Sequence, residues 1–248
     1  MMLEDPQPDA TLGTWASRPH SPKGWYSRGY HPHFDQSGLV QSITFRLDDS
    51  VPEAQLRQWR VELGILGAHL GDDEGMAKLR ARIDKYEDAG HGACHLREPG
   101  IAAMVEEALF FFDGERYRLL EWSVMPNHVH VLVETVPGHV LSDVMQAWKS
   151  FTAKSANRIL GRNGKFWMAD YFDRFIRDER HLAAARAYIR ANPVKAGLCE
   201  TEQGWRFGSA WEGERAGGPP GRAGVPPADW SAGQRPAHPG KEPFREEI

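Results

Sequence analysis

The sequence predicts an α+β fold: one compact domain over roughly residues 25–211, in which antiparallel strands combine with amphipathic helices. Two observations lead to this prediction. Short segments alternate apolar and polar residues or are rich in β-formers, as strands are, and longer segments repeat apolar residues at helical spacing. The length of 248 residues and the hydrophobic content of 41% are sufficient for a domain with its own core.

Three segments predict strands. Residues 41–47 (QSITFRL) place Ile43, Phe45 and Leu47 in strict alternation. Residues 117–124 (YRLLEWSV) and 127–134 (NHVHVLVE) are both rich in β-formers and are separated only by Met125 and Pro126. We therefore expect the last two to be neighbouring strands joined by a short break.

Four segments predict helices: 51–66, 100–114, 141–160 and 181–192. Apolar residues of the third segment, among them Met145, Trp148, Phe151 and Ile159, predict its buried face. The fourth helix is expected to end before Pro193, because the residue before a proline disfavours helical ψ. The polar, charged stretch that follows residue 66 and runs to Lys85 shows no clear helical or strand periodicity.

The ends of the chain differ from its centre. Residues up to about 38 contain Pro, Gly, Ser and His with few aliphatics, which predicts irregular structure, with residues 1–27 as a flexible arm. His31 and His33 fall in this stretch and are read as part of it. From residue 212 to 248 the composition is dominated by Gly, Pro, Ala and Arg, which predicts a disordered tail.

Composition narrows the class of protein. The sequence has no apolar run long enough to cross a bilayer and no signal-peptide pattern, and it holds two cysteines, so we expect a cytoplasmic protein. The net charge is −4, yet residues 149–206 carry twelve basic against six acidic residues. Such a segment is able to bind phosphates, although it is also common on solvated surfaces.

The most informative segment is 127–134. In a strand, Val129, Val131 and Val133 point to one face, while His128 and His130 point together to the other with Cβ atoms about 7 Å apart. Two imidazoles at this spacing are able to hold one metal ion. Taken alone, a His-x-His pair is more often a pair of surface histidines, but the valine face behind it favours a ligand pair.

A second pair lies on a predicted helix. Tyr188 and Asn192 are four residues apart and therefore one turn apart on the same face. Such a tyrosine is usually part of a core, but it could also be a nucleophile, with Asn192 as a third, oxygen-donating metal ligand. A phenol has a pKa near 10 and needs a cation beside it to attack a phosphate at neutral pH. Two imidazoles and a carboxamide suit Mg²⁺ or Mn²⁺.

At this point the chain resembles a known family. MPNHVHVLVE is similar to the HUH motif (His, hydrophobic residue, His) of single-tyrosine transposases and relaxase-like nucleases. YIRANPVKAGL resembles the nucleophile helix of the REP-associated tyrosine transposases, which belong to the small insertion-sequence transposases. Three flanking segments, GYHPHFDQSGLVQSITFRLDDS, DAGHGACHL and FWMADYFDRFIRDERHL, extend the resemblance over residues 28–211 in the same order.

The resemblance implies a ferredoxin-like palm and an enzyme that cuts and rejoins single-stranded DNA at hairpins, typically repetitive extragenic palindromes, through a 5′-phosphotyrosine. It gives Tyr188 the role of nucleophile, His128 and His130 the role of metal ligands, and Asn192 the place that completes the metal site. It favours a monomer, with a dimer as the alternative, and association with the nucleoid when DNA is bound. The basic segment supplies candidate DNA contacts: Lys149, Lys154, Arg186, Arg190 and Lys195.

Other readings stay open at this stage. Tyr171 is a second candidate nucleophile, but no Asn or Gln follows it four residues later. His91, Cys94 and His95 could suggest zinc, yet no second ligand pair follows them, so we read them as structural. The rival functions are a domesticated hairpin-binding protein that does not cut, and a hydrolase of small phosphoesters in which Tyr188 only packs.

Overall fold

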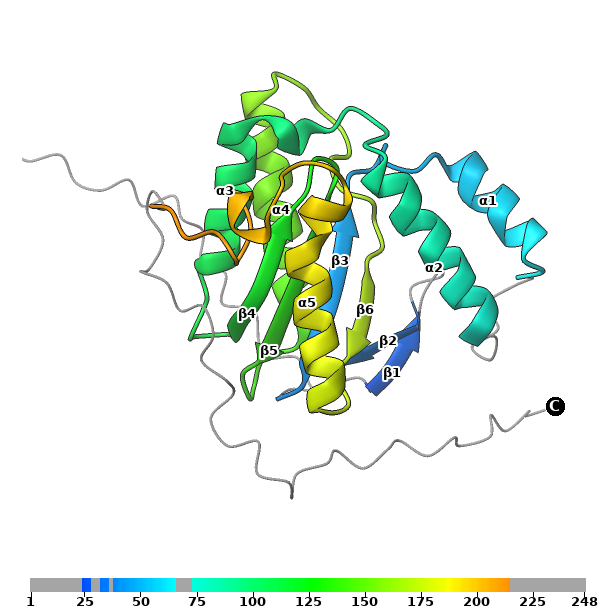
Figure 1. Cartoon of the computed structure of the whole chain (residues 1–248), viewed down its shortest axis with the longest axis horizontal. Coiled ribbons are helices and arrows are strands. Elements are labelled where there is room, and N and C mark those ends of the chain that lie inside the picture. Colours follow the sequence, from blue (N-terminus) through cyan, green and yellow to red (C-terminus); the bar gives the residue numbers. More distant parts are fainter. Residues whose placement is uncertain (1–23, 28–31, 36–37, 66–72, 215–248) are drawn as a thin grey trace, which may run out of the picture.

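The computed structural model describes residues 24–27, 32–35, 38–65 and 73–214 (Figure 1). Most of the predicted arm at 1–27 and of the predicted tail at 212–248 therefore lies outside the described residues, as does His31. The main sheet has the strand order β4-β5-β3-β6, and every neighbouring pair in it is antiparallel. Its strands are β3 (Val40–Arg46), β4 (Tyr117–Val124), β5 (His128–Thr135) and β6 (Phe172–Phe175).

The topology is that of a ferredoxin-like domain, as predicted. Helix α3 (Pro99–Phe110) connects β3 to β4, and helix α4 (Leu141–Ile159) connects β5 to β6. The order β-α-β-β-α-β with the first and third strands in the centre places β5 inside the sheet, between β4 and β3. A central strand is hydrogen-bonded on both edges, so the side chains of β5 are held in fixed positions.

The sheet has two cores, one on each face. Val129, Val131 and Val133 pack with α3 and α4 in the larger core, which confirms the predicted valine face. On the other face, Leu132 packs with Ile189 of α5 (Glu179–Lys195) in a second cluster. Figure 1 shows α5 on one side of the sheet and α3 and α4 on the other. The alternation of β5 therefore sends its histidines to the α5 side.

An insertion between β3 and α3 contributes two further helices, α1 (Glu53–Glu62) and α2 (Asp73–Asp88). They share a third apolar cluster, formed by Val51, Leu56, Leu79 and Ile83. The loop after α2 is anchored to the end of β3: a Cβ on Gly92 would lie 2.7 Å from the backbone oxygen of Asp49, and φ there is +84°. Only glycine fits this approach without strain, so α2 ends at a fixed place beside the sheet.

Several predictions about local structure are wrong. Helix α2 and strand β6 lie where no element was expected, and a hairpin of β1 (Gly24–Ser27) and β2 (Pro32–Asp35) lies in the stretch expected to be irregular. Strand pairing supplies the hydrogen bonds that such short segments lack on their own. Helix α5 continues through Pro193 to Lys195, because the burial of Ile189 and Pro193 offsets the one hydrogen bond that the proline cannot make.

Two apolar residues predicted to be buried on α4 are exposed: Phe151 at 52% and Ile159 at 56%. Met145 and Trp148 of the same helix are buried as predicted. The apolar stripe of α4 is thus narrower than the spacing suggested. Two short 3-10 helices, His95–Arg97 and Glu202–Gly204, complete the described structure. Within it, no helix is both long enough and apolar enough to span a membrane.

Candidate active site

The two histidines of β5 meet on the α5 side of the sheet. They are buried, at 1% and 2% exposure, and pair across the sheet with Arg46 and Thr44 of β3. The Nε2 atoms of His128 and His130 lie 3.0 Å apart, and their rings are nearly perpendicular. The strand thus brings two imidazole nitrogens to one point, as the His-x-His spacing predicted.

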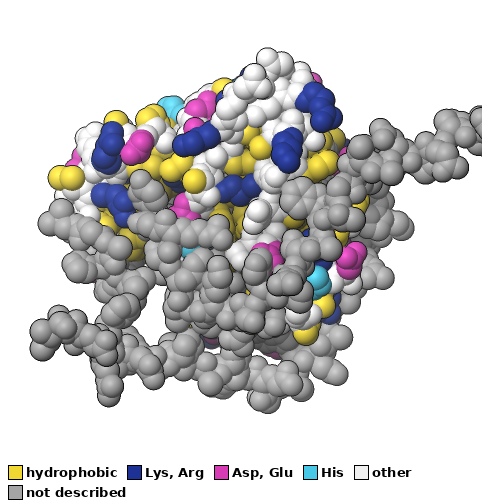
Figure 2. All heavy atoms as spheres, turned by 180° about the vertical axis from the view of Figure 1, so that it is seen from behind, with side chains coloured by type: hydrophobic (Ala, Val, Ile, Leu, Met, Phe, Trp, Pro, Cys, Tyr) yellow, Lys and Arg dark blue, Asp and Glu magenta, His cyan; other side chains and the backbone are white. Residues whose placement is uncertain are grey.

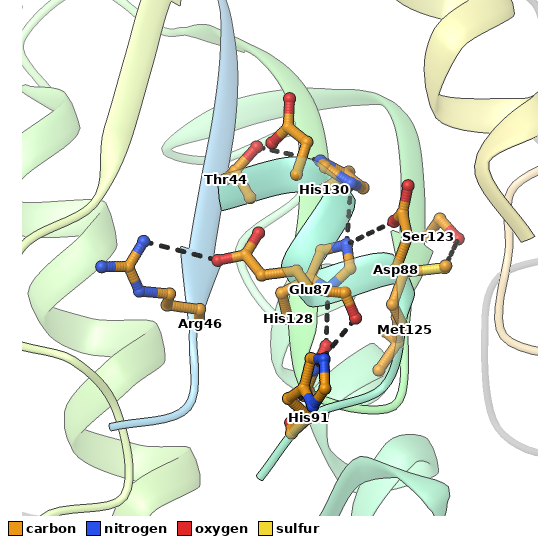
Figure 3. A network of polar contacts seen from close by, with 12 residues as sticks. Thr44, Arg46, Glu87, Asp88, His91, Ser123, Met125, His128 and His130 are labelled. Carbon is orange, nitrogen blue, oxygen red and sulfur yellow. Dashed lines mark hydrogen bonds and ion pairs between the residues drawn. The ribbon is translucent and has the colours of Figure 1, made fainter. Parts of the chain in front are cut away.

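Asn127 orients the first histidine. Its Nδ2 donates to the backbone oxygens of Glu87 (3.1 Å) and His91 (2.9 Å), so its Oδ1 is left as an acceptor, 2.8 Å from Nδ1 of His128. An imidazole that donates through Nδ1 presents a lone pair at Nε2 when it is neutral. The second histidine has an analogous partner, since its Nδ1 lies 2.9 Å from the hydroxyl of Thr44. Figure 3 shows the contact between Thr44 and His130 beside His128.

Both histidines are neutral at physiological pH. Burial lowers the pKa of His128 to about 3, with further lowering from the positive charge of Arg80. Burial also lowers the pKa of His130 well below its usual value, helped by His128, Arg80 and Lys195. Neutral imidazole is the form that binds metals, so the site holds its histidines ready for a cation without first losing protons.

Helix α5 places the tyrosine against this pair. The ring of Tyr188 lies 5.3 Å from that of His130, measured between centroids, at an angle of 79°. One turn further along, Asn192 is 1% exposed, and neither its Oδ1 nor its Nδ2 has a hydrogen-bond partner within the described structure. A buried carboxamide without partners is costly, which is the situation expected of a side chain that awaits a ligand.

Tyr188 is held as a protonated phenol. Burial raises its pKa well above the usual value, and the negative charges of Asp84 and Asp88 add to this, while Arg80 partly opposes it. The ammonium of Lys195 lies 5.1 Å from the centroid of the Tyr188 ring. Ionisation of this phenol therefore needs additional positive charge or a proton acceptor at the site.

The residues of the site fit a divalent cation. Ligands bonded at about 2.1 Å and at right angles to one another lie about 3.0 Å apart, and the two Nε2 atoms are separated by 3.0 Å. The unpartnered Asn192 is suited to add a neutral oxygen. No group of three His, Cys, Asp or Glu side chains in the described ranges is arranged to hold a metal, so the third ligand of such an ion has to be of another type, as a carboxamide is.

The sequence reasoning missed the contribution of α2. This helix brings four charged residues to the histidines: Arg80, Asp84, Glu87 and Asp88. Glu87 is 2% exposed and pairs with Arg46 at 3.4 Å, and burial raises its pKa. Burial also raises the pKa of Asp88, to about 6, with help from Asp84 and Glu87. The helical spacing of Met76, Leu79 and Ile83 is the signal that would have revealed α2.

The five predicted DNA contacts are not gathered in one place. Arg190 binds Glu121 through two nitrogens, at 2.9 and 2.6 Å, and Arg186 lies 3.7 Å from the same carboxylate. Lys149 donates to the backbone oxygens of Met168 and Ala169. Lys154 is exposed on α4, and only Lys195 lies beside Tyr188. On the face drawn in Figure 2, Lys and Arg side chains lie singly among hydrophobic and acidic ones.

The other candidates of the sequence take structural positions. Tyr171 is 3% exposed and lies 4.6 Å from the ring of His33, away from the two histidines of β5. His33 itself is 1% exposed rather than part of an irregular arm. His91 stacks on Tyr86, the thiol of Cys94 donates to the backbone oxygen of Gly90, and His95 accepts from Arg162. Each of these side chains thus has a packing role.

Comparison with known proteins finds one family model that matches the segment holding this site. The model of the family described as "Transposase IS200 like" matches residues 106–192. No curated protein is significantly similar to the chain. Among solved structures, a REP-associated tyrosine transposase bound to a REP hairpin shares 18% identity, with a TM-score of 0.43, over 83% of this chain and 96% of the other. A candidate transposase from Deinococcus radiodurans R1 shares 16% identity, with a TM-score of 0.27, over 67% and 96%.

The assignment rests on the matched segment and what it contains. Residues 106–192 include β4, β5, α4, β6 and nearly all of α5, and so both histidines, the tyrosine and the asparagine of the site. The segment thus contains three of the four strands of the main sheet, together with most of the helix that packs on it. Through this segment, the chain is similar to the IS200-like transposases.

Proposed function

We propose that the chain is a metal-dependent, single-tyrosine HUH transposase of the REP-associated branch. It cleaves and rejoins single-stranded DNA at hairpin sites, such as REP-like palindromes, through a 5′-phosphotyrosine. The observation that carries the proposal is the convergence of Tyr188 on the His128–His130 pair, with 5.3 Å between the ring centroids of Tyr188 and His130. The hairpin substrate and the REP-associated branch rest on the sequence motifs that flank the site.

The chemistry follows from the positions of the side chains. The hydroxyl oxygen of Tyr188 attacks the phosphorus of a phosphodiester, so that a bond forms from this oxygen to phosphorus and the bond to the 3′ oxygen breaks. The DNA leaves a free 3′-hydroxyl, protonated from solvent, and its 5′-phosphate stays on the tyrosine. Attack by a 3′-hydroxyl reverses the step and rejoins strands without ATP, because the covalent bond conserves the energy of the phosphodiester.

The protein's own groups prepare this step. The carboxylate of Asp84 lies close enough to Tyr188 to influence its pKa, and it is the acid placed to take the phenol proton. A divalent cation, Mg²⁺ or Mn²⁺, held by His128, His130 and Asn192, would polarise the phosphate and offset its developing charge. Lys195, beside the Tyr188 ring, adds positive charge where the phosphate and phenolate meet. Burial of the histidines keeps competing water away from their lone pairs.

The decisive test is the covalent intermediate. The full chain is incubated with Mn²⁺ and an end-labelled DNA hairpin with a single-stranded flank, and the products are separated on a denaturing gel. We expect a protein–DNA band from the wild type and none from Tyr188→Phe, because phenylalanine has no nucleophile. The matched control is Tyr171→Phe, which removes the hydroxyl of the buried second candidate and is expected to keep the band.

The same experiment separates the rival functions. A wild type that binds the hairpin but gives no covalent band supports the non-cleaving binder. A band that persists in Tyr188→Phe and vanishes in Tyr171→Phe would show that Tyr171, and not Tyr188, is the nucleophile. Cleavage of a blunt duplex at the same rate as the single-stranded flank would contradict the proposed substrate class, and hydrolysis of a small phosphodiester by Tyr188→Phe would favour the phosphoesterase.

A further inference from the structure

Three arginines line one cavity beside the two histidines of β5. They come from three different elements: Arg46 from β3, Arg60 from α1 and Arg80 from α2. Thr44 also lines the cavity, and its hydroxyl lies 2.9 Å from Nδ1 of His130. The cavity therefore adjoins the candidate active site.

Positive charge exceeds negative charge in the lining of this cavity. Among the described residues that line it, the acids are Glu87 and Asp170, against three guanidinium groups. Asp170 already lies 2.9 Å from Nε2 of His33, and the pKa of that imidazole is raised to about 9. The charge of Asp170 is thus balanced from outside the cavity, and the space beside the arginines is suited to an anion.

Arg46 has donors that the protein leaves unused. Its side chain is 12% exposed, and its contact with Glu87, drawn in Figure 3, is 3.4 Å long, which exceeds the usual length of a hydrogen bond between charged groups. Its Nε is buried without a hydrogen-bond partner within the described structure. A buried donor without an acceptor is costly, so Arg46 is in the state expected of a side chain that binds a ligand.

Arg80 brings a second guanidinium to the same cavity. Its central carbon lies 4.5 Å from the centroid of the Phe172 ring, and it pairs with Asp84 at 2.7 Å, so its position is fixed from two sides. The positive charge of Arg80 lowers the pKa values of Tyr188 and of both histidines of the site. It therefore lies close enough to act on a substrate bound there.

The size of the cavity limits the group that it admits. Its volume is about 30 Å³, which is room for roughly two water molecules. The two non-bridging oxygens of a phosphodiester need about this space, whereas a nucleobase is much larger. Guanidinium groups match such oxygens in charge and geometry. Arg46 and Arg80 are 12% and 15% exposed, so the cavity is not sealed from outside.

We propose that Arg46 and Arg80 bind a phosphodiester of the single-stranded DNA next to the one that Tyr188 attacks. The inference rests on the proposed function. Arg46 stands directly opposite His128 in the pairing of β3 with β5, and such residues point to the same face of a sheet. A phosphate in the cavity thus lies beside the histidines and positions the strand for attack, without reading its base sequence.

The test is the salt dependence of DNA binding. The full chain binds a fluorescent DNA hairpin with a single-stranded flank, without divalent metal, at a series of salt concentrations. Each phosphate that the protein neutralises on a single strand adds about 0.7 to the slope of log affinity against log salt. For Arg46→Gln and Arg80→Gln we expect binding about tenfold weaker and a slope lower by about 0.7. The double variant should lower the slope no further, because both arginines hold the same phosphate.

The matched control is Arg82→Gln. Arg82 lies two residues from Arg80 and so on the opposite side of α2, where it is partly exposed and pairs with Glu62. It removes the same charge and should change the affinity less than about twofold. Weaker binding with an unchanged slope in Arg80→Gln would contradict the proposal, because the loss of a phosphate contact has to change the slope.

Neutral phosphates locate the contact on the DNA. Each phosphate of the single-stranded flank is replaced in turn by an uncharged methylphosphonate. We expect one position, next to the cleavage site, at which the wild type loses affinity and Arg46→Gln loses no more. If Arg46 only supported the fold, its substitution would weaken binding to every DNA alike and no such position would exist.

Folding of the variants is checked by thermal melting. Arg46→Gln leaves the buried Glu87 without its cation, so this variant is the one at risk of unfolding. If it unfolds, Arg80→Gln decides the outcome in both experiments, because its side chain is closer to the surface. An Arg80→Gln variant that keeps the wild-type affinity, slope and methylphosphonate pattern overturns the proposal.

The covalent band of the wild type separates the two proposals. If the wild type forms the band while Arg46→Gln and Arg80→Gln bind DNA with unchanged affinity and slope, the cleavage function stands and the phosphate site is wrong. If both variants lose affinity and slope but the wild type forms no band, the phosphate site stands and the cleavage function is wrong. A wild type that does not bind the hairpin refutes both.

Discussion

Glu121 is fully buried on β4, and the chain surrounds its carboxylate with donors. Arg190 binds it through two nitrogens, Arg186 lies 3.7 Å away, and the hydroxyl of Ser209 donates at 2.5 Å. Because Arg190 is two residues from Tyr188 on α5, this cluster ties the helix of the proposed nucleophile to the sheet. At the scale of single residues, two of the arginines first considered as DNA contacts thus have a different role.

Replacing Glu121 by glutamine is expected to destabilise the protein by about 2 kcal/mol. A buried ion pair that loses one partner costs about 3–5 kcal/mol, and the loss is smaller here because Arg190 is about one-third exposed. The measurement is the free energy of unfolding in urea at pH 7.

The matched control is Glu134→Gln on the neighbouring strand, where Glu134 pairs with the partly exposed Arg118. An exposed pair of this kind contributes about 1 kcal/mol or less. Equal losses in Glu121→Gln and Glu134→Gln would show that burial does not distinguish the two pairs, against the expectation.

At the scale of elements, His33 joins the hairpin to the main sheet. Its Nδ1 contacts Asp173 of β6, and its Nε2 lies 2.9 Å from Asp170 just before that strand. Burial alone would lower the pKa of His33, but hydrogen bonds to Asp170 and Asp173 and their charges outweigh it and raise the pKa to about 9. The imidazolium between two carboxylates therefore holds β2 against β6.

This link predicts a loss of stability in mild alkali. The folded pKa of about 9 exceeds the value of 6.5 for an unperturbed histidine, so the contribution is complete below about pH 6.5 and is lost as pH rises through about 9. The difference corresponds to roughly 3 kcal/mol. The free energy of unfolding of the wild type, followed from pH 6 to 10, should fall by about this amount more than that of His33→Gln.

The difference between wild type and His33→Gln isolates His33, because lysines, cysteines and tyrosines titrate in the same pH range in both proteins. Parallel curves for wild type and His33→Gln would mean that His33 is not charged in the folded protein. A steeper fall for His33→Gln would contradict the sign of the effect.

At the scale of the whole molecule, one chain contains a complete site. Tyr188 on α5 lies against the histidines of β5 of the same chain, and α5 is seated by apolar contacts of Ile189 and Leu182 with the face of the sheet that carries them. A monomer is therefore sufficient for the proposed chemistry, and exchange of α5 between two chains is not required.

Mixing two inactive variants tests this arrangement. Tyr188→Phe lacks the nucleophile and His128→Ala lacks a metal ligand, and a site formed within one chain cannot combine the intact halves of both. We expect the mixture to give no covalent protein–DNA band. Recovery of the band to a substantial fraction of the wild-type signal would instead show that the tyrosine is supplied by a second chain.

Features of this protein that depend on local periodicity are predictable from the amino-acid sequence. The alternation of β5 separates the valines from the two histidines, and the four-residue spacing on α5 puts Tyr188 and Asn192 on one face. These patterns were predicted because neighbours in sequence fix them. Helix α2 and strand β6 were not predicted, since their formation depends on partners distant in sequence.

Which side chains surround the two histidines depends on the packing of elements that are distant in sequence. Asp88 reaches His128, forty residues later, because Asn127 and the close approach at Gly92 fix the end of α2 beside β5. Arg186 and Arg190 are predicted as DNA contacts from the basic segment, and only packing reveals the buried Glu121 beside them. Periodicity specifies which side chains share one face of a helix or strand. Which residues contact that face is set by how the elements pack.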